Sequence, residues 1–130
     1  MSVKNLKQTV TIRATPHDVY RAIVDPEEHE AFTGAAAELE PKVGGMFSHY
    51  DGSLTGVVLD IKPDARIVLG WRSGDWPEGA YSVAQFLFKK VKGGTRIEFS
   101  QFGIPTGDFK DISSGWRTYY WSPLKEYLET

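Results

Sequence analysis

The three histidines are the first residues to consider for chemistry, because imidazole serves both as a metal ligand and as a general base. His17, His29 and His49 are scattered over two expected helices and one expected strand. His49 and Asp51 are two residues apart, which on a strand places both side chains on one face. No third ligand follows at a suitable spacing, so the sequence predicts no metal site.

Residue sets for nucleophilic or acid–base chemistry are also not recognisable. The chain contains no cysteine, which excludes thiolate catalysis, disulfides and cysteine-ligated metals. Asp60 and Glu98 fall on expected solvent-facing strand positions, so they do not form a carboxylate pair in an apolar setting. The glycines at 44–45 and 93–94 lie in expected turns, so neither pair forms a phosphate-binding loop. We assign no catalytic residue and expect no cofactor.

The bulk properties are those of one ordinary globular domain spanning residues 1–130. A hydrophobic content of 41% and a charged content of 25% are typical of such a domain. The net charge of −2 provides no basic field for nucleic acid. No segment approaches the ~20 apolar residues of a membrane span, and the N-terminus lacks the apolar run of a signal peptide. We therefore expect no nucleic-acid partner, no membrane association and a cytoplasmic location.

The stretch 111–129 predicts one long amphipathic helix. At about 100° per residue, its apolar residues gather on one side and its polar residues on the other. The apolar side comprises Ile112, Trp116, Tyr120, Pro123, Leu124, Tyr127 and Leu128, with Tyr119 and Trp121 at its edges. So wide and aromatic an apolar face needs a broad concave surface to cover it.

Gly115 and Pro123 predict a bend in this helix. Glycine disfavours a helix interior, and proline removes the backbone donor that would bond the carbonyl of Tyr119. Two explanations remain open. The helix curves round its own sheet, or it is shaped to leave a ligand space beneath Trp116 and Tyr120.

The N-terminal part predicts a strand followed by two short helices. Leu6, Val10 and Ile12 alternate with polar residues, a pattern that only Gln8 interrupts. Thr15, followed by proline, is a typical helix N-cap, and the Asp25-Pro26 pair repeats the signal for a second helix running to about Phe32.

The rest of the chain predicts an antiparallel meander of short strands. Asp51-Gly52 and Gly93-Gly94 are hairpin signals between alternating apolar residues. The expected strands are 36–40, 45–50, 54–61, 67–72, 80–91 and 95–103. Their expected inward residues include Val57, Leu59 and Ile61; Ile67, Leu69 and Trp71; and Ile97, Phe99 and Gln101. The predicted fold is α+β, with a curved antiparallel sheet wrapped round the long C-terminal helix.

Several short motifs resemble, in order and spacing, those of one known family. They are Gly44-Gly45-x-Phe47, Asp51-Gly52 with Gly56, Trp71-Arg72, Gly94-Thr95 and Gly115-Trp116. The chain resembles the activator of heat-shock protein 90 ATPase family, specifically its C-terminal domain and single-domain relatives, within the START-like group of the SRPBCC superfamily. The resemblance covers essentially the whole chain. It implies a helix-grip fold of order β-α-α-β(6)-α and a role in the stress response.

The resemblance does not by itself imply a reaction, because this architecture serves several functions. We favour a non-enzymatic START-like domain that binds a small hydrophobic or amphipathic molecule between the sheet and the last helix. One alternative is a chaperone-associated module. The eukaryotic co-chaperone has a separate N-terminal domain, for which 130 residues leave no room, so ATPase activation is not expected. The other alternative is a cofactor-free enzyme acting on a hydrophobic substrate.

The expected ligand-binding residues are those whose side chains should line the space between sheet and helix. They are Phe47, His49, Leu59, Leu69, Trp71, Phe99, Gln101, Trp116 and Tyr120, with Trp76 and Phe32 expected at the cavity mouth. Aromatic walls with a few polar groups are typical of small-molecule pockets, but they are equally typical of cores. Both interpretations stay open for each residue.

Two further questions concern single side chains. The amide of Gln101 on an apolar face must find a partner, which is Tyr120 or Gln8 in a filled core and a ligand or water in a hollow one. Trp121, at the edge of the apolar face, would support a homodimer if it were left bare. The two short helices would cover it otherwise.

Overall fold

The computed structural model describes residues 2–130, which form one curved sheet, one long C-terminal helical segment and two short helices. The elements are β1 (Val3–Ile12), α1 (Pro16–Val24), α2 (Pro26–Thr33), β2 (Glu38–Leu39), β3 (Met46–His49), β4 (Leu54–Lys62), β5 (Arg66–Ser73), β6 (Ser82–Val91), β7 (Gly94–Pro105), the 3-10 turn η1 (Thr106–Asp108), α3 (Phe109–Gly115), the π-helical segment η2 (Trp116–Trp121) and α4 (Ser122–Glu129). This order confirms the expected helix-grip fold.

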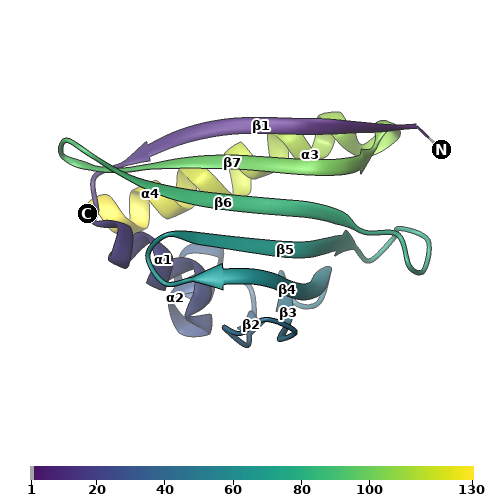
Figure 1. The fold of residues 1–130 in the computed structure, drawn as a ribbon, viewed down its shortest axis with the longest axis horizontal. Helices are drawn as coiled ribbons and strands as arrows, with labels where there is room; N and C mark the ends of the chain where they lie inside the picture. Colours follow the sequence, from purple (N-terminus) through teal and green to yellow (C-terminus); the bar gives the residue numbers. More distant parts are fainter. Residues whose placement is uncertain (1) are drawn as a thin grey trace.

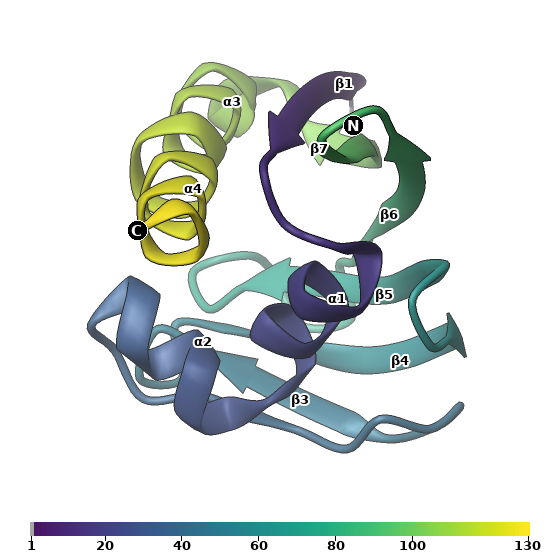
Figure 2. The same ribbon diagram turned by 90° about the vertical axis from the view of Figure 1, so that its left-hand side faces the viewer.

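The seven strands form a single antiparallel sheet in the order β1-β7-β6-β5-β4-β3-β2. Its broad convex face is turned to the viewer in Figure 1, with the C-terminal helical segment behind it. Figure 2 shows the sheet bending round that segment, with α1 and α2 near the C-terminal end of α4. The C-terminal segment thus has the sheet on one side and the short helices at one end.

Both short helices begin as their sequences predict. The hydroxyl of Thr15 accepts the backbone N–H of Asp18, and the carboxylate of Asp25 accepts the N–H of Glu27. A proline occupies the first turn of each helix, where its missing N–H is not needed. The second helix ends at Gly34, which adopts a left-handed conformation with φ of 78°.

The expected inward faces of β5 and β7 are confirmed, but that of β4 is wrong in part. Leu59 was expected inside and is 45% exposed on the convex face, whereas Val58 is fully buried. The cause is an irregularity in the pairing of β4 with β5 between Val58 and Asp60. An extra residue at such a bulge reverses, on one side of it, the alternation of inward and outward side chains. The inward pattern that includes Ile61 therefore does not extend back to Val57, and Val58 faces inward in its place.

Candidate functional site

A cavity of about 410 Å³ lies between the β3–β4 hairpin and the first half of the C-terminal helical segment. A volume of this size is within the usual range for small-molecule sites. Its walls come from three places: the hairpin, one residue of β5, and the region where α3 passes into η2. The lining residues are His49, Tyr50, Ser53, Leu54, Trp71, Ile112, Gly115, Trp116, Tyr119 and Tyr120.

The π-helical segment η2 shapes one wall of this cavity. In η2 the backbone N–H of Ser122 bonds the carbonyl of Arg117, five residues earlier. Pro123 has no N–H for the carbonyl of Tyr119, four residues before it, and this carbonyl accepts the hydroxyl of Tyr50 instead. The expected bend is therefore a π-helical segment, a feature that is frequent at functional sites.

The wider turns of η2 also decide which aromatic residues are buried. Trp121 was expected at the edge of the apolar face and is buried, while Tyr119 at the other edge is 66% exposed. A wheel drawn at 100° per residue does not apply where hydrogen bonds close i→i+5 turns. Trp121 is therefore not available as the bare surface of a homodimer, and the interface expected there is wrong.

Two stacked imidazoles stand behind the cavity. The rings of His49 and His29 have centroids 3.8 Å apart, and His29 Nε2 lies 3.1 Å from the hydroxyl of Tyr120. Burial lowers the pKa of His29 to about 4. Burial, and then repulsion from His29, also holds the pKa of His49 well below its ordinary value. Both rings are thus neutral at pH 7.

The cavity wall carries no formal charge at neutral pH. None of its ten lining residues is a lysine, arginine, aspartate or glutamate. Burial raises the pKa of Tyr50 to about 12 and that of Tyr120 well above its ordinary value. The polar groups that remain are hydroxyls and one neutral imidazole, which can exchange hydrogen bonds with a ligand.

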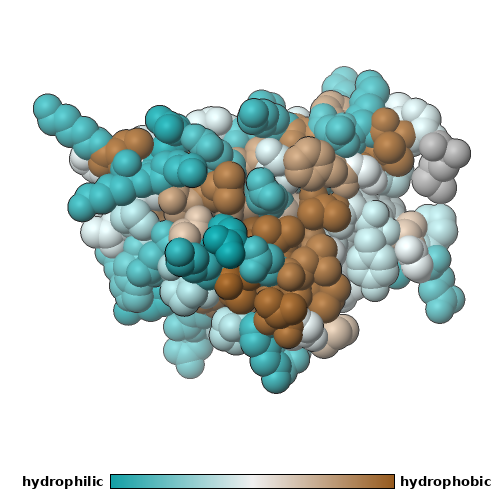
Figure 3. Space-filling model, in the orientation of Figure 1, coloured by the Kyte–Doolittle hydropathy of each residue, from teal (hydrophilic) through white to brown (hydrophobic). Residues whose placement is uncertain are grey.

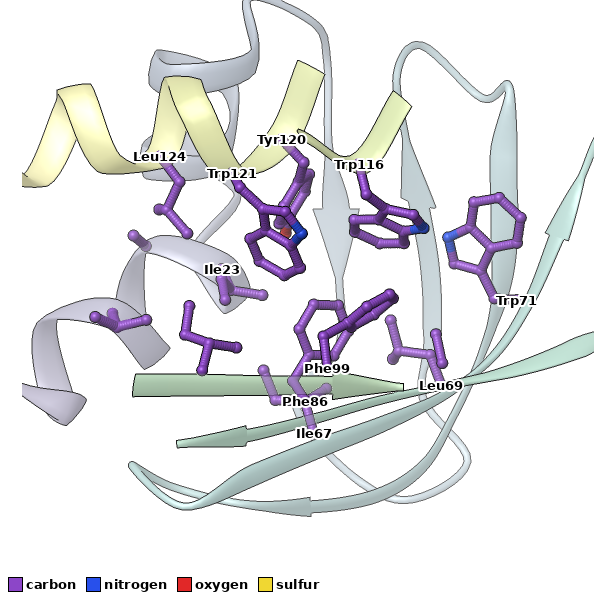
Figure 4. Close-up of a cluster of buried hydrophobic side chains, with 14 of the residues drawn as sticks. Ile23, Ile67, Leu69, Trp71, Phe86, Phe99, Trp116, Tyr120, Trp121 and Leu124 are labelled. Carbon is purple, nitrogen blue, oxygen red and sulfur yellow. The ribbon is translucent and has the colours of Figure 1, made fainter. Parts of the chain in front are cut away.

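Beside the cavity, the space between sheet and helix is filled (Figure 4). Phe99 lies against Phe86, Trp116 and Trp121, with ring centroids 4.4 to 5.3 Å apart. The indoles of Trp116 and Trp121 stack with an interplanar angle of 24°. Most of the aromatic surface on the two facing layers is therefore core.

Two buried glutamines on the inner face of the sheet hold these two indoles. Gln101 Oε1 accepts Trp116 Nε1–H at 2.8 Å, and its Nε2 donates to the hydroxyl of Ser82 at 2.9 Å. Gln8 Oε1 accepts Trp121 Nε1–H at 2.8 Å. The partner of Gln101 is thus neither Tyr120, Gln8, a ligand nor water, because the amide is satisfied within the core.

The structure separates the nine expected ligand-binding residues into three groups. Four line the cavity: His49, Trp71, Trp116 and Tyr120. Four are buried but lie outside its lining: Phe47, Leu69, Phe99 and Gln101. Leu59 points away from the interior, for the reason given above. The sequence pattern thus identified inward-facing residues in most cases, but not which of them border an open space.

The two residues expected at the cavity mouth lie elsewhere. Trp76 is buried against Trp71 at 5.5 Å between centroids, and its indole N–H donates to Asp108 at 2.8 Å. Phe32 packs edge-on against Tyr120. Both residues therefore pack as part of the core.

Sequence reasoning missed most of the hairpin wall. Tyr50, Ser53 and Leu54 surround the Asp51-Gly52 turn, which was interpreted only as a connection between strands. The signal that could have identified this wall was Tyr50, an aromatic residue directly before the turn. His29 was also missed as a core residue, since an isolated histidine on a short helix gives no sign of its stacking partner.

Within residues 2–130 no group of three or more histidines and carboxylates is arranged to hold a metal ion. Asp51, the expected neighbour of His49, instead accepts the backbone N–H of Ala36 at 2.8 Å. In the same described residues no helix is long and apolar enough to cross a membrane.

Comparison with known proteins identifies relatives along most of the chain. Residues 13–129 match the family model described as "Activator of Hsp90 ATPase homolog 1-like protein". The human activator of 90 kDa heat shock protein ATPase homolog 1 is 34% identical over 116 residues, which cover 89% of this chain and 34% of that protein. The Dictyostelium discoideum homolog is 33% identical over 117 residues, covering 89% and 30%. The chain thus spans about a third of these relatives.

Solved structures agree over nearly the full length. One described as an HSP90 activator from Plasmodium falciparum superposes with a TM-score of 0.91 at 26% identity, covering 98% of this chain and 97% of that chain. The solution structure of an Aha1 dimer from Colwellia psychrerythraea superposes with a TM-score of 0.79 at 20% identity, covering 97% of this chain and 96% of that chain. At this identity the likeness is evidence for the fold only. The match to the family model and the identity to the human relative show that the chain belongs to the Activator of Hsp90 ATPase homolog 1-like family.

Proposed function

We propose that this chain is a module that associates with the chaperone Hsp90 and acts on its ATPase. The observation that carries the proposal is the whole-length match to the Plasmodium structure. That solved chain is described as an HSP90 activator, and this chain covers 97% of it. This match supports an action on the ATPase by a domain of this extent, contrary to the expectation from the sequence.

The test measures ATP hydrolysis by Hsp90 from the same source, with and without this chain. A specific inhibitor of the Hsp90 nucleotide site defines the background rate. We expect a saturable rise in the inhibitor-sensitive rate, together with co-sedimentation of the two proteins. Absence of both complex and rate change at about 100 µM would contradict the proposal, since it would limit the affinity to the millimolar range.

A second candidate function, binding of a small hydrophobic or amphipathic molecule, is supported by the cavity. The aromatic and aliphatic walls offer apolar contact, while the neutral imidazole of His49 and the hydroxyl of Ser53 offer hydrogen bonds. An uncharged or weakly polar molecule suits such walls, because a charged group would lose its hydration without a counter-ion.

Gly115 provides a sharp test of this second candidate. A Cβ at Gly115 would first meet Tyr119 Cδ2 at 3.9 Å, an ordinary contact, and Gly115 lines the cavity, so Gly115→Leu is expected to fill part of it. Thermal unfolding is measured with and without fractions of an organic extract from the host. A ligand at 100 times its Kd should stabilise the wild type by about 2.7 kcal/mol and Gly115→Leu much less.

The matched control is Gly107→Leu, because a Cβ at Gly107 meets nothing within 4 Å and this residue is outside the cavity lining. This variant should respond to the ligand as the wild type does. Equal responses of all three proteins would place any ligand elsewhere. No response of the wild type to any fraction would count against the cavity as a binding site.

A further inference from the structure

The four tryptophans of the chain differ in whether their indole N–H groups are hydrogen-bonded. Three of these groups donate to side chains at 2.8 Å: Trp76 to Asp108, Trp116 to Gln101 and Trp121 to Gln8. Among residues 2–130, nothing accepts the indole N–H of Trp71, although this residue is only 4% exposed. Buried polar groups in native proteins usually have a partner, so one without a partner in the chain indicates a ligand or water.

The unbonded N–H of Trp71 is not sealed in the core. Trp71 lines the cavity together with Trp116, and Figure 4 shows its indole nitrogen on the side turned towards Trp116. Their ring centroids are 6.1 Å apart. In the described part of the chain, the sealed side-chain atoms without a partner are His29 Nδ1 and Arg72 Nε. The nitrogen of Trp71 is not one of them, so it borders open space, which at this ring is the cavity.

The convex face of the sheet provides a contrast. Figure 3 shows hydrophobic residues gathered over this face. Exposed apolar side chains are normal on a monomer and leave no hydrogen bond unmade, so they do not identify a partner. The N–H of Trp71 belongs to a buried side chain and can only donate, so it specifies the chemistry of the group that would meet it.

The polar groups at the inner end of the cavity favour a hydrogen-bond acceptor on the ligand. To the hydroxyls and the imidazole already described, the indole N–H of Trp71 is added. The neutral imidazole of His49 has one donor and one acceptor nitrogen, so an acceptor suits both residues. The hydroxyls of Tyr50 and Tyr120 already have hydrogen-bond partners within the chain. A carbonyl oxygen has two lone pairs and can therefore accept from Trp71 and His49.

Burial along the cavity orients such a ligand. Trp71 and His49 are 4% and 5% exposed, so the unbonded polar groups lie at the inner end. The lining residues Ser53 and Tyr119 are exposed and mark the mouth. The half-buried Leu54 belongs to the wall between the inner end and the mouth. A ligand therefore enters with its polar end first and leaves its apolar body nearer the mouth.

We propose that the cavity takes an uncharged carbonyl compound with an apolar body, whose oxygen accepts the indole N–H of Trp71. This proposal rests on the second candidate function above and names the class of ligand and its anchoring atom. A carboxylate would also accept this hydrogen bond. It would, however, bring a charge that no lining residue neutralises. A hydrocarbon of the same shape would leave the N–H without an acceptor.

Benzophenone and diphenylmethane test the proposal, because they differ mainly in the carbonyl oxygen. The ratio of their dissociation constants is measured by calorimetry in the wild type and in two variants. Trp71→Phe removes the anchoring N–H and should shift this ratio about tenfold in favour of diphenylmethane. The matched control Trp76→Phe removes an indole N–H that has its own partner outside the cavity lining. It should leave the ratio unchanged. Diphenylacetate, which is charged, should not bind detectably to any of the three proteins.

The indole N–H signals in NMR spectra provide a second readout, which uses only the wild-type fold. Without a ligand, the N–H of Trp71 should exchange with solvent faster than the other three, which are hydrogen-bonded. The signal is assigned by its loss in Trp71→Phe. Saturation with benzophenone should slow this exchange and move the signal downfield, whereas diphenylmethane should do neither.

The outcomes separate the anchor from the cavity function. Binding of both neutral probes with the same ratio in the wild type and Trp71→Phe would overturn the anchor and leave the cavity function in place. Exchange at Trp71 as slow as at Trp116 in the free protein would also overturn the anchor, because it would reveal an acceptor within the chain. Binding of neither neutral probe at saturation would overturn both. If Trp71→Phe does not fold, the comparison of the two probes by wild-type NMR decides alone.

Discussion

The space between the sheet and the C-terminal helical segment has two parts that differ in how their polar groups are matched. In the filled part, Gln8 and Gln101 each bind one indole N–H, and both amides are buried. In the open part, His49 lines the cavity, and no hydrogen bond of its ring is formed within residues 2–130. The two glutamines are thus matched inside the core, whereas the imidazole of His49 is left free to bind a ligand in the cavity.

The largest predicted effect is the difference in stability loss between truncating Phe99 in the filled part and truncating Leu54 in the open part. Phe99 is fully buried against both indoles, so Phe99→Ala should lower the free energy of unfolding by about 3–5 kcal/mol. Leu54→Ala removes a half-buried side chain that already borders the cavity, and should cost less than about 1.5 kcal/mol. Urea unfolding of both variants measures the contrast. Similar losses would mean that the open part is packed as tightly as the core.

Acidification should destabilise the protein through the histidine pair. The pKa of His29 falls from an ordinary 6.5 to about 4 on folding, so protonation favours the unfolded chain. The stabilisation is complete above pH 6.5 and is lost as the pH falls towards 4. This loss amounts to about 3 kcal/mol for His29.

The imidazole signals of His29 and His17 in NMR spectra allow this prediction to be checked within one sample. His17 is exposed on α1 beside Asp64, so its signals serve as a reference for a ring outside the core. The ring of His29 should stay neutral until the protein unfolds. A His29 titration near pH 6.5 in the folded state would show that its surroundings admit water.

Replacement of Gln101 tests the importance of polar matching in the filled part. Gln101→Leu keeps the apolar volume but leaves the buried indole N–H of Trp116 without its acceptor. An unsatisfied buried donor costs about 1–3 kcal/mol, which chemical denaturation should detect. The double variant with Trp116→Phe removes the orphaned donor as well. It should therefore lose less than the sum of the two single variants.

The sequence predicted the architecture well because its signals are local and redundant. The caps at Thr15 and Asp25 and the alternation in β5 and β7 each specify an element without knowledge of the rest. The partner of Gln101 could not be predicted in the same way. Ser82 and Trp116 meet it only after three elements pack, and no periodicity encodes that contact.

Two irregularities in the backbone explain the main errors at the site. The bulge after Val58 reversed the alternation that had placed Leu59 inside. Tyr119 and Trp121 were both expected at the edges of the apolar helix face, and the π-helical segment buries Trp121 while leaving Tyr119 exposed. Pro123 correctly predicted an irregularity in the helix. The sequence could not show that the hydroxyl of Tyr50 would donate to the carbonyl of Tyr119, which Pro123 leaves without a backbone donor.

The hydrogen bond from Tyr50 to the carbonyl of Tyr119 gives the smallest predicted effect, and it joins two walls of the open part. Tyr50→Phe keeps the ring in the cavity wall and removes only the donated hydrogen bond. Because the site is partly open to water, the carbonyl can be rehydrated, and the loss should be about 0.5–1 kcal/mol. Amide exchange should then quicken around Tyr119 on η2 but not around Leu124 on α4, which is fully buried. Uniform acceleration along both would mean that the hydrogen bond supports the whole helical segment and not only the cavity wall.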